Sequence, residues 1–132
     1  MTTYTLKSGT YLVGDPALIF KKNESGTKVT RKLWDTFYQD MNAFQHLDIE
    51  GIDLFITRTA EGDGFYQGVG TDTGTIMIIR IDAYLEDERL NVIPNRSGML
   101  TLAIHEGETI TVDRFNIYFS NGVQIITQSD DI

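Results

Sequence analysis

The residues best suited to chemistry lie in one glycine-rich stretch that runs from Gly62 to Gly74. It contains five of the chain's 12 glycines, two carboxylates, and the adjacent rings of Phe65 and Tyr66. Glycine accepts positive φ and lets a ligand approach the backbone closely, and successive amides in such a loop can form an anion-binding nest. Tight turns or a β-bulge between twisted strands would also require these glycines. The stretch is therefore either a binding loop or a structural connection.

The two glycine motifs that bind nucleotide phosphates are absent from this stretch. A phosphate loop needs a lysine after its last glycine, whereas Thr75 follows Gly74. The dinucleotide fingerprint needs Gly-x-Gly-x-x-Gly at the start of a helix, but the spacing here differs and a strand is expected to follow. Any ligand of this stretch must therefore be held by contacts other than those of a phosphate loop or a dinucleotide fingerprint.

The triplet Asp72-Thr73-Gly74 matches that of the aspartic proteases, in which two carboxylates share one proton and act as acid and base. A homodimer could supply one such aspartate per subunit. Apolar residues normally precede that aspartate, whereas Gly70-Thr71 precedes it here, and the later apolar-apolar-glycine signature is missing. An Asx-type turn before a strand is the simpler interpretation, and no catalytic residue is assigned.

Metal and cofactor sites have weak support in the sequence. Asp15, Asp63 and Asp72 each lie beside a glycine, so folding could bring them together around a hard cation, although turns also favour aspartate for local reasons. His46 and His105 are the only two histidines, they form no zinc-type pair, and both are expected in loops or at strand ends. No metal and no cofactor is therefore assigned.

One helix is expected to support the sheet, over residues 27–44. Its apolar side chains recur every three or four residues, which is typical of an amphipathic helix. Thr27 or Ser25 is expected to cap it, while Trp34 and Tyr38 widen the apolar stripe. The stripe itself consists of Val29, Leu33, Phe37, Met41 and Phe44.

The rest of the chain is expected to be β-structure. A strand or early hairpin over residues 4–13 precedes the Gly14-Asp15-Pro16 turn, and a further strand covers residues 52–59. Residues 75–82 are almost all apolar, which predicts a strand buried on both faces. Strands are also expected over residues 99–105 and 109–113.

A hairpin is expected near the end of the chain. Asn121-Gly122 would supply the two positive φ angles of a type I′ turn, which sets Ile117 opposite Ile126. Residues 129–131 are expected to be loose. The core face of this hairpin would consist of Phe115, Ile117, Phe119 and Ile126.

Together these elements predict one α+β domain over residues 1–132, with a mainly antiparallel sheet, curved or partly closed into a barrel, and one principal amphipathic helix. The absence of cysteine excludes disulfides, thiolate metal sites and a cysteine nucleophile. The start has no signal-peptide pattern and no stretch reaches a membrane-spanning length. A cytoplasmic location without a membrane partner is therefore expected.

The formal net charge of −8 disfavours direct binding to a nucleic-acid backbone. Three interpretations of the acidic balance stay open: it keeps the protein soluble, it steers a basic partner or mimics DNA, or it attracts cations.

Three motifs carry a family resemblance: Val13-Gly14-Asp15-Pro16, Gly62-Asp63-Gly64-Phe65-Tyr66 and Asp72-Thr73-Gly74-Thr75-Ile76. With these motifs in this order, the chain resembles small uncharacterised proteins of bacteriophages and prophages. The resemblance covers about half of the chain. It implies a phage accessory protein in the host cytoplasm, a counter-defence class that includes proteins that sequester signalling nucleotides or block host enzymes.

The leading prediction is a non-enzymatic module that binds a small, nucleotide-like ligand where the glycine-rich stretch meets the Gly14-Asp15-Pro16 turn. The alternatives are an acidic inhibitor or interaction protein for a host factor, and a hydrolase that depends on Asp72. A homo-oligomer is compatible with each. The candidate ligand-binding residues are Asp15, Asp63, Gly64, Tyr66, Asp72 and Thr73.

Overall fold

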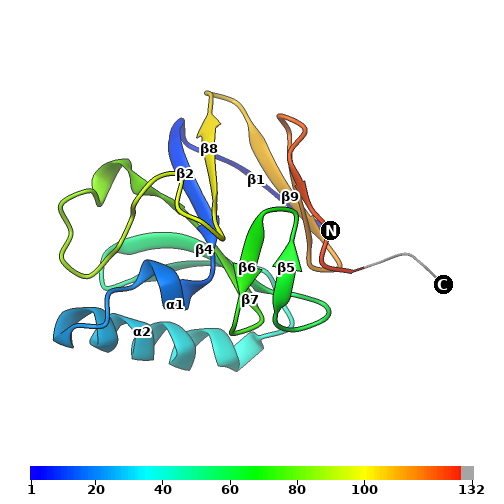
Figure 1. Cartoon of the computed structure of the whole chain (residues 1–132). Coiled ribbons are helices and arrows are strands. Elements are labelled where there is room, and N and C mark those ends of the chain that lie inside the picture. The colour runs from blue at the N-terminus through cyan, green and yellow to red at the C-terminus, as the bar shows by residue number, and fades with distance from the viewer. Residues whose placement is uncertain (129–132) are drawn as a thin grey trace.

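The computed structural model describes residues 1–128, so the expected loose segment 129–131 lies outside the described residues. The fold is α+β, with antiparallel sheets that do not close into a barrel and one principal helix (Figure 1). The larger sheet has the strand order β3 (Gln45–Ile49), β4 (Ile52–Arg58), β7 (Thr75–Arg80), β2 (Gly9–Gly14) and β8 (Leu100–Ile104). The second sheet has the order β1 (Thr2–Thr5), β9 (Thr109–Asp113), β10 (Asn116–Phe119) and β11 (Gln124–Ile125).

The remaining elements are short apart from one helix. Strands β5 (Gly64–Tyr66) and β6 (Val69–Thr71) form a hairpin within the glycine-rich stretch. Helix α1 (Pro16–Ile19) follows β2, and the main helix α2 (Glu24–Phe37) lies along the larger sheet (Figure 1). Two 3-10 turns, Tyr38–Asp40 and Ile81–Ala83, follow α2 and β7. No helix in residues 1–128 has the length and apolarity that crossing a membrane requires.

The larger sheet is buried on both faces and forms the middle of three layers. Along β7, Met77 and Ile79 belong to the core beneath the helices, whereas Ile76 and Ile78 belong to the core shared with the second sheet. All four side chains are fully buried, because successive residues of a strand point to opposite faces. The expected doubly buried strand is confirmed.

The expected helix is confirmed in part, but its boundaries differ. Asn23 caps α2 by accepting a hydrogen bond from the Gly26 amide at 2.7 Å, so neither Thr27 nor Ser25 is the cap. The helix ends at Phe37, where the Gln45 side chain donates to the free Phe37 carbonyl at 3.0 Å. Phe44 leaves the helical stripe and stacks on Phe55, in the core shared by the two sheets.

The expected early hairpin is wrong, because β1 and β2 join different sheets. Strand β1 pairs with β9, and β2 pairs with β7 and β8. Strand β3 begins directly after the expected end of the helix at residue 44, where no strand was expected, and it is an additional edge strand paired with β4. The partners of β1 and β2 lie far away in the sequence and are set by which face of each strand can be buried, whereas β3 pairs with the strand that follows it directly.

The register expected for the last hairpin is also wrong, by one residue. Ile117 pairs with Ile125, and of the three loop residues only Gly122 has positive φ, at 99°. This three-residue loop replaces the type I′ turn, so Ile125, not Ile126, is buried in the core. Consecutive positive φ angles occur in three other turns: Glu50–Gly51 between β3 and β4, Gln67–Gly68 between β5 and β6, and Arg114–Phe115 between β9 and β10.

Phe115 is consequently a turn residue and not part of the core face. Its ring lies beneath the Arg58 guanidinium, whose carbon is 4.3 Å from the ring centroid. A cation over an aromatic face is attracted by the ring quadrupole. This contact connects the end of β4 to the β9–β10 turn.

The observed register predicts unequal effects at two adjacent isoleucines. Replacing buried Ile125 with Ala should lower the free energy of unfolding by about 2–4 kcal/mol, because a large buried side chain leaves a cavity. Replacing Ile126, which is only half-buried, should lower it by less than about 1 kcal/mol. Urea denaturation followed by circular dichroism measures both. An equal or reversed order would contradict this register.

Candidate functional site

Asp15 is a buried carboxylate that organises the region around the glycine-rich stretch. Its side chain is 1% exposed and accepts hydrogen bonds from the amides of Ala17 at 2.8 Å, Asp72 at 2.7 Å and Thr73 at 3.0 Å. The hydroxyl of Thr71 donates to it at 2.7 Å. A buried charge is tolerated when hydrogen-bond donors replace its hydration, and here those donors are amides and hydroxyls.

The Asp72-Thr73-Gly74 triplet is a turn built on Asp15. The Thr73 hydroxyl also donates to the Asp15 carboxylate, at 3.0 and 3.1 Å, and it contacts the Thr75 hydroxyl at 2.6 Å. Gly74 has a φ of 72°, and a Cβ there would meet the Gly62 backbone at 3.3 Å. The Thr71 hydroxyl also accepts hydrogen bonds from the amides of Thr73 at 3.3 Å and Thr75 at 3.2 Å. Within residues 1–128 the Asp72 side chain has no hydrogen-bond partner, so Asp15 and Thr71 hold this turn, and not Asp72 as in the expected Asx-type turn.

A recess opens beside this turn, and we call it the hairpin recess. It has a volume of about 420 Å³. The Gly70 amide donates to the Gly98 carbonyl at 2.9 Å, which ties the β5–β6 hairpin (green in Figure 1) to the loop before β8. The recess is lined by Leu18, Asp63, Gly64, Phe65, Gly70, Thr71, Asp72 and Gly98.

The structure brings some of the sequence candidates together and separates others. Asp63, Gly64 and Asp72 line the hairpin recess. Asp15 and Thr73 are not among its lining residues and hold the turn that forms its wall. These five residues thus belong to one local assembly of lining and supporting groups.

Tyr66 does not line the hairpin recess. It packs against the core shared by the two sheets, and its hydroxyl donates to the Gly62 carbonyl at 2.9 Å. Its neighbour Phe65 points to the other face, as alternation along a strand requires. Phe65 lines the recess and is 70% exposed.

The hypothesis of a hard-cation site at Asp15, Asp63 and Asp72 is not supported. Within residues 1–128, no three acidic or histidine side chains gather closely enough to hold a metal ion. The oxygens of Asp15 already accept hydrogen bonds from amides and hydroxyls, and a cation would have to displace these donors.

A second cavity, which the sequence did not reveal, lies between the two sheets, and we call it the inter-sheet cleft. Its volume is about 80 Å³. Nε2 of His46 lies 2.5 Å from Oδ1 of Asp53, and the His46 ring stacks on Phe55 with centroids 4.3 Å apart. The cleft is lined by Thr5, Leu6, Lys7, Tyr11, His46, Asp53, Phe55, Ile78 and Arg80.

Tyr11 is the most deeply buried polar side chain of the inter-sheet cleft, at 4% exposed. Burial raises the pKa of its hydroxyl above the usual value of 10.0, while nearby Arg80 opposes that increase and Asp53 adds to it. The hydroxyl donates to the Lys7 carbonyl at 2.8 Å. Tyr11 is therefore neutral at physiological pH and attaches the segment after β1 to the larger sheet.

The cleft could have been found only with the strand register. His46 pairs with Phe55 across β3 and β4, and Asp53 lies two residues before Phe55, so His46 and Asp53 are diagonal neighbours on one face. Because β3 was not expected, the sequence offered no reason to place this histidine beside this aspartate.

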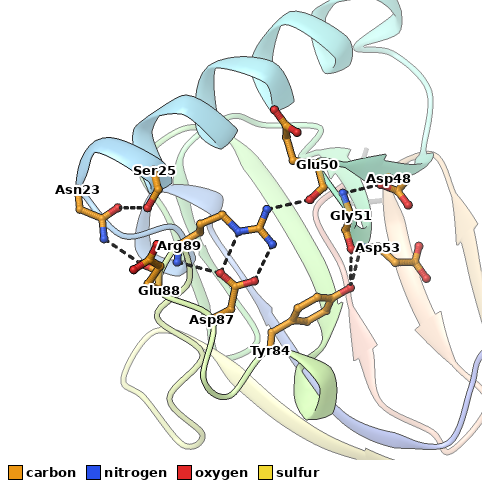
Figure 2. Close-up of polar contacts among 10 residues, drawn as sticks. All are labelled: Asn23, Ser25, Asp48, Glu50, Gly51, Asp53, Tyr84, Asp87, Glu88 and Arg89. Carbon is orange, nitrogen blue, oxygen red and sulfur yellow. Dashed lines mark hydrogen bonds and ion pairs between the residues drawn. The ribbon is translucent and has the colours of Figure 1, made fainter.

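A polar network fixes the loop that follows β7 (Figure 2). Arg89 donates to both carboxylate oxygens of Asp87, at 2.9 and 2.6 Å, and to the Glu50 carbonyl at 2.8 Å. The amide of Asp53 donates to the Tyr84 hydroxyl at 2.9 Å. The loop is thereby fastened to the β3–β4 turn, which positions Asp53 in the inter-sheet cleft.

Comparison of the chain with protein-family models, curated proteins and solved structures gives no significant match. The resemblance to phage proteins stays a prediction, and function is inferred from geometry alone.

The central role of Asp15 predicts a large loss of stability on its neutralisation. Asp15→Asn should lower the free energy of unfolding by about 2–4 kcal/mol, since hydrogen bonds to a charged acceptor contribute roughly 1.5–3 kcal/mol each and the new amide would face other donors. The control is Asp72→Asn, whose exposed side chain should change stability by less than about 0.5 kcal/mol. Chemical denaturation measures both, and equal losses would contradict the role of Asp15.

The Asp87–Arg89 pair predicts a pH-dependent contribution to stability. The bonds donated by Arg89 lower the pKa of Asp87 below its ordinary value of 3.8. The stabilisation is thus fully present above that value and is lost as the pH falls through the lower pKa of the folded state. The difference in unfolding free energy between the native chain and Asp87→Asn should be present at pH 7 and shrink below pH 3.8.

The control for this pH dependence is Glu86→Gln. Glu86 is exposed, and it has no ion pair or side-chain hydrogen bond within residues 1–128. Its substitution should leave the unfolding free energy nearly unchanged from acid to neutral pH, as measured by urea titrations at each pH. A difference for Asp87→Asn that stays constant with pH would show that its charge is not the stabilising feature.

Proposed function

We propose that the chain is a non-enzymatic binding protein whose small ligand occupies the hairpin recess. The observation that carries this proposal is the arrangement of its lining. One exposed aromatic ring, Phe65, and two exposed carboxylates, Asp63 and Asp72, lie around a recess of about 420 Å³. That volume is within the usual range of roughly 300–1,000 Å³ for small-molecule sites.

The lining favours a planar ligand that carries hydrogen-bond donors. The face of Phe65 offers a stacking surface for a ring, and a carboxylate accepts hydrogen bonds from ring amino groups. Two carboxylates and a net charge of −8 repel phosphate groups. The ligand is therefore nucleotide-like at its base end, and any phosphate must point away from the recess.

The walls of the hairpin recess are held in place by neighbouring residues before a ligand binds. The turn bearing Asp72 is held by Asp15 through hydrogen bonds of 2.7 and 3.0 Å. The ring of Phe65 passes over Gly70, where a Cβ would lie 3.5 Å from the ring. A wall that is ordered before binding loses less entropy when the ligand arrives, so the buried carboxylate contributes without touching the ligand.

The lining argues for binding and against turnover. Among residues 1–128, the only titratable groups that line the recess are the two exposed carboxylates. The hydroxyl of Thr71 is engaged by Asp15 at 2.7 Å and by the Thr75 carbonyl at 3.0 Å, so it is not poised as a nucleophile. An activated nucleophile needs an adjacent base, and the recess lining offers no such pair.

Calorimetric titration with guanosine, adenosine and cytidine tests the proposal. At least one nucleoside should bind, and its monophosphate should bind no more tightly. Phe65→Ala should weaken binding by about tenfold or more, since stacking of a base on an aromatic ring contributes roughly 1–3 kcal/mol. Asp63→Asn should also weaken it.

The matched control is Asp35→Asn, which removes an exposed carboxylate on helix α2 and should leave affinity unchanged. An absence of binding for every nucleoside would overturn the proposal. Equal losses for Asp35→Asn and Asp63→Asn would show that only the overall charge matters.

A further inference from the structure

The face of the larger sheet that meets the second sheet changes from apolar to polar at one end. Phe55 pairs with Ile78 across β4 and β7. Two residues further along each strand, on the same face, lie Asp53 and Arg80, and Arg80 pairs with Tyr11 of β2. Inner faces of packed sheets are normally filled by apolar side chains, so a polar row there forms the distinctive wall of the inter-sheet cleft.

The positive groups of this wall are not all neutralised. Arg80 donates from Nε to the Ser8 carbonyl at 2.6 Å, and its Nη2 lies 3.3 Å from Asp82. Within residues 1–128, Nη1 of Arg80 and the ammonium of Lys7 have no hydrogen-bond or ion-pair partner. Two cationic side chains of the cleft therefore retain N–H groups that can donate hydrogen bonds to an anion.

His46 is oriented by its neighbours. Asp53 engages its Nε2 at 2.5 Å and the ring stacks on Phe55, which leaves Nδ1 without a partner in the described part of the chain. The backbone of Asp53 is itself held by the Tyr84 hydroxyl (Figure 2). These contacts hold the His46 ring in one orientation before a ligand binds, and binding sites are typically preorganised in this way.

We propose that the inter-sheet cleft binds a small monocarboxylate. Its volume of about 80 Å³ admits only a few heavy atoms. Leu6, Phe55 and Ile78 offer an apolar wall for a short hydrocarbon chain, while Lys7 and Arg80 supply donors for the carboxylate. A dianion such as phosphate fits less well, since Asp53 and Asp82 add negative charge nearby.

This site is independent of the proposed function. The inter-sheet cleft and the hairpin recess share no lining residue. Failure of nucleoside binding would thus leave the carboxylate site standing, and the reverse also holds.

Two-dimensional amide NMR of the full chain titrated with propionate tests the proposal. The amides of residues that line the cleft, among them Tyr11 and Arg80, should shift saturably. Propionamide, a neutral molecule of nearly the same shape, should cause no such shifts. Lys7→Met should raise the dissociation constant for propionate by about two- to fivefold, the upper range for one exposed charge pair.

The control variant is Lys28→Met, which removes an exposed lysine of helix α2 and should leave the dissociation constant unchanged. Well-dispersed spectra of every variant verify that it is folded. Shifts that do not saturate, equal shifts with propionamide, or equal losses for the two lysine variants would each overturn the proposal. An unchanged affinity in Lys7→Met would overturn it too.

Discussion

The hydrogen bonding of one buried carboxylate, Asp15, is the interaction on which this part of the structure depends. Removing a charge from water is costly unless donors replace its hydration, and Asp15 obtains them from the start of helix α1 and from the turn at residues 71–73. Two segments separated by more than fifty residues are thereby held together. The Gly-Asp-Pro and Asp-Thr-Gly motifs thus form one hydrogen-bonded structural unit.

Local periodicity predicted the elements whose buried faces follow from the spacing of their own apolar residues. Val29, Leu33 and Phe37 recur at helical spacing and are all buried, and the apolar run from Ile76 to Ile79 is buried on both faces. In such segments the pattern of apolar side chains and the faces that must be covered determine the structure together. The α+β class follows from these two segments and their packing.

Features that depend on distant partners or on the register between strands could not be predicted from the sequence. Phe44 continued the helical spacing, yet it stacks on Phe55 in the core shared by the sheets. The cleft containing His46 exists because β3 pairs with β4 in one particular register. For the hairpin recess, the sequence identified Asp63 and Asp72, but alternation alone did not decide whether Phe65 or Tyr66 would face it.

Strand β7 connects the two proposed sites. It begins at Thr75, in the turn built on Asp15, and it ends at Arg80, in the inter-sheet cleft. A ligand that displaced this strand along its axis would therefore alter both sites. By thermodynamic linkage, each ligand would then change the affinity of the other by the same factor.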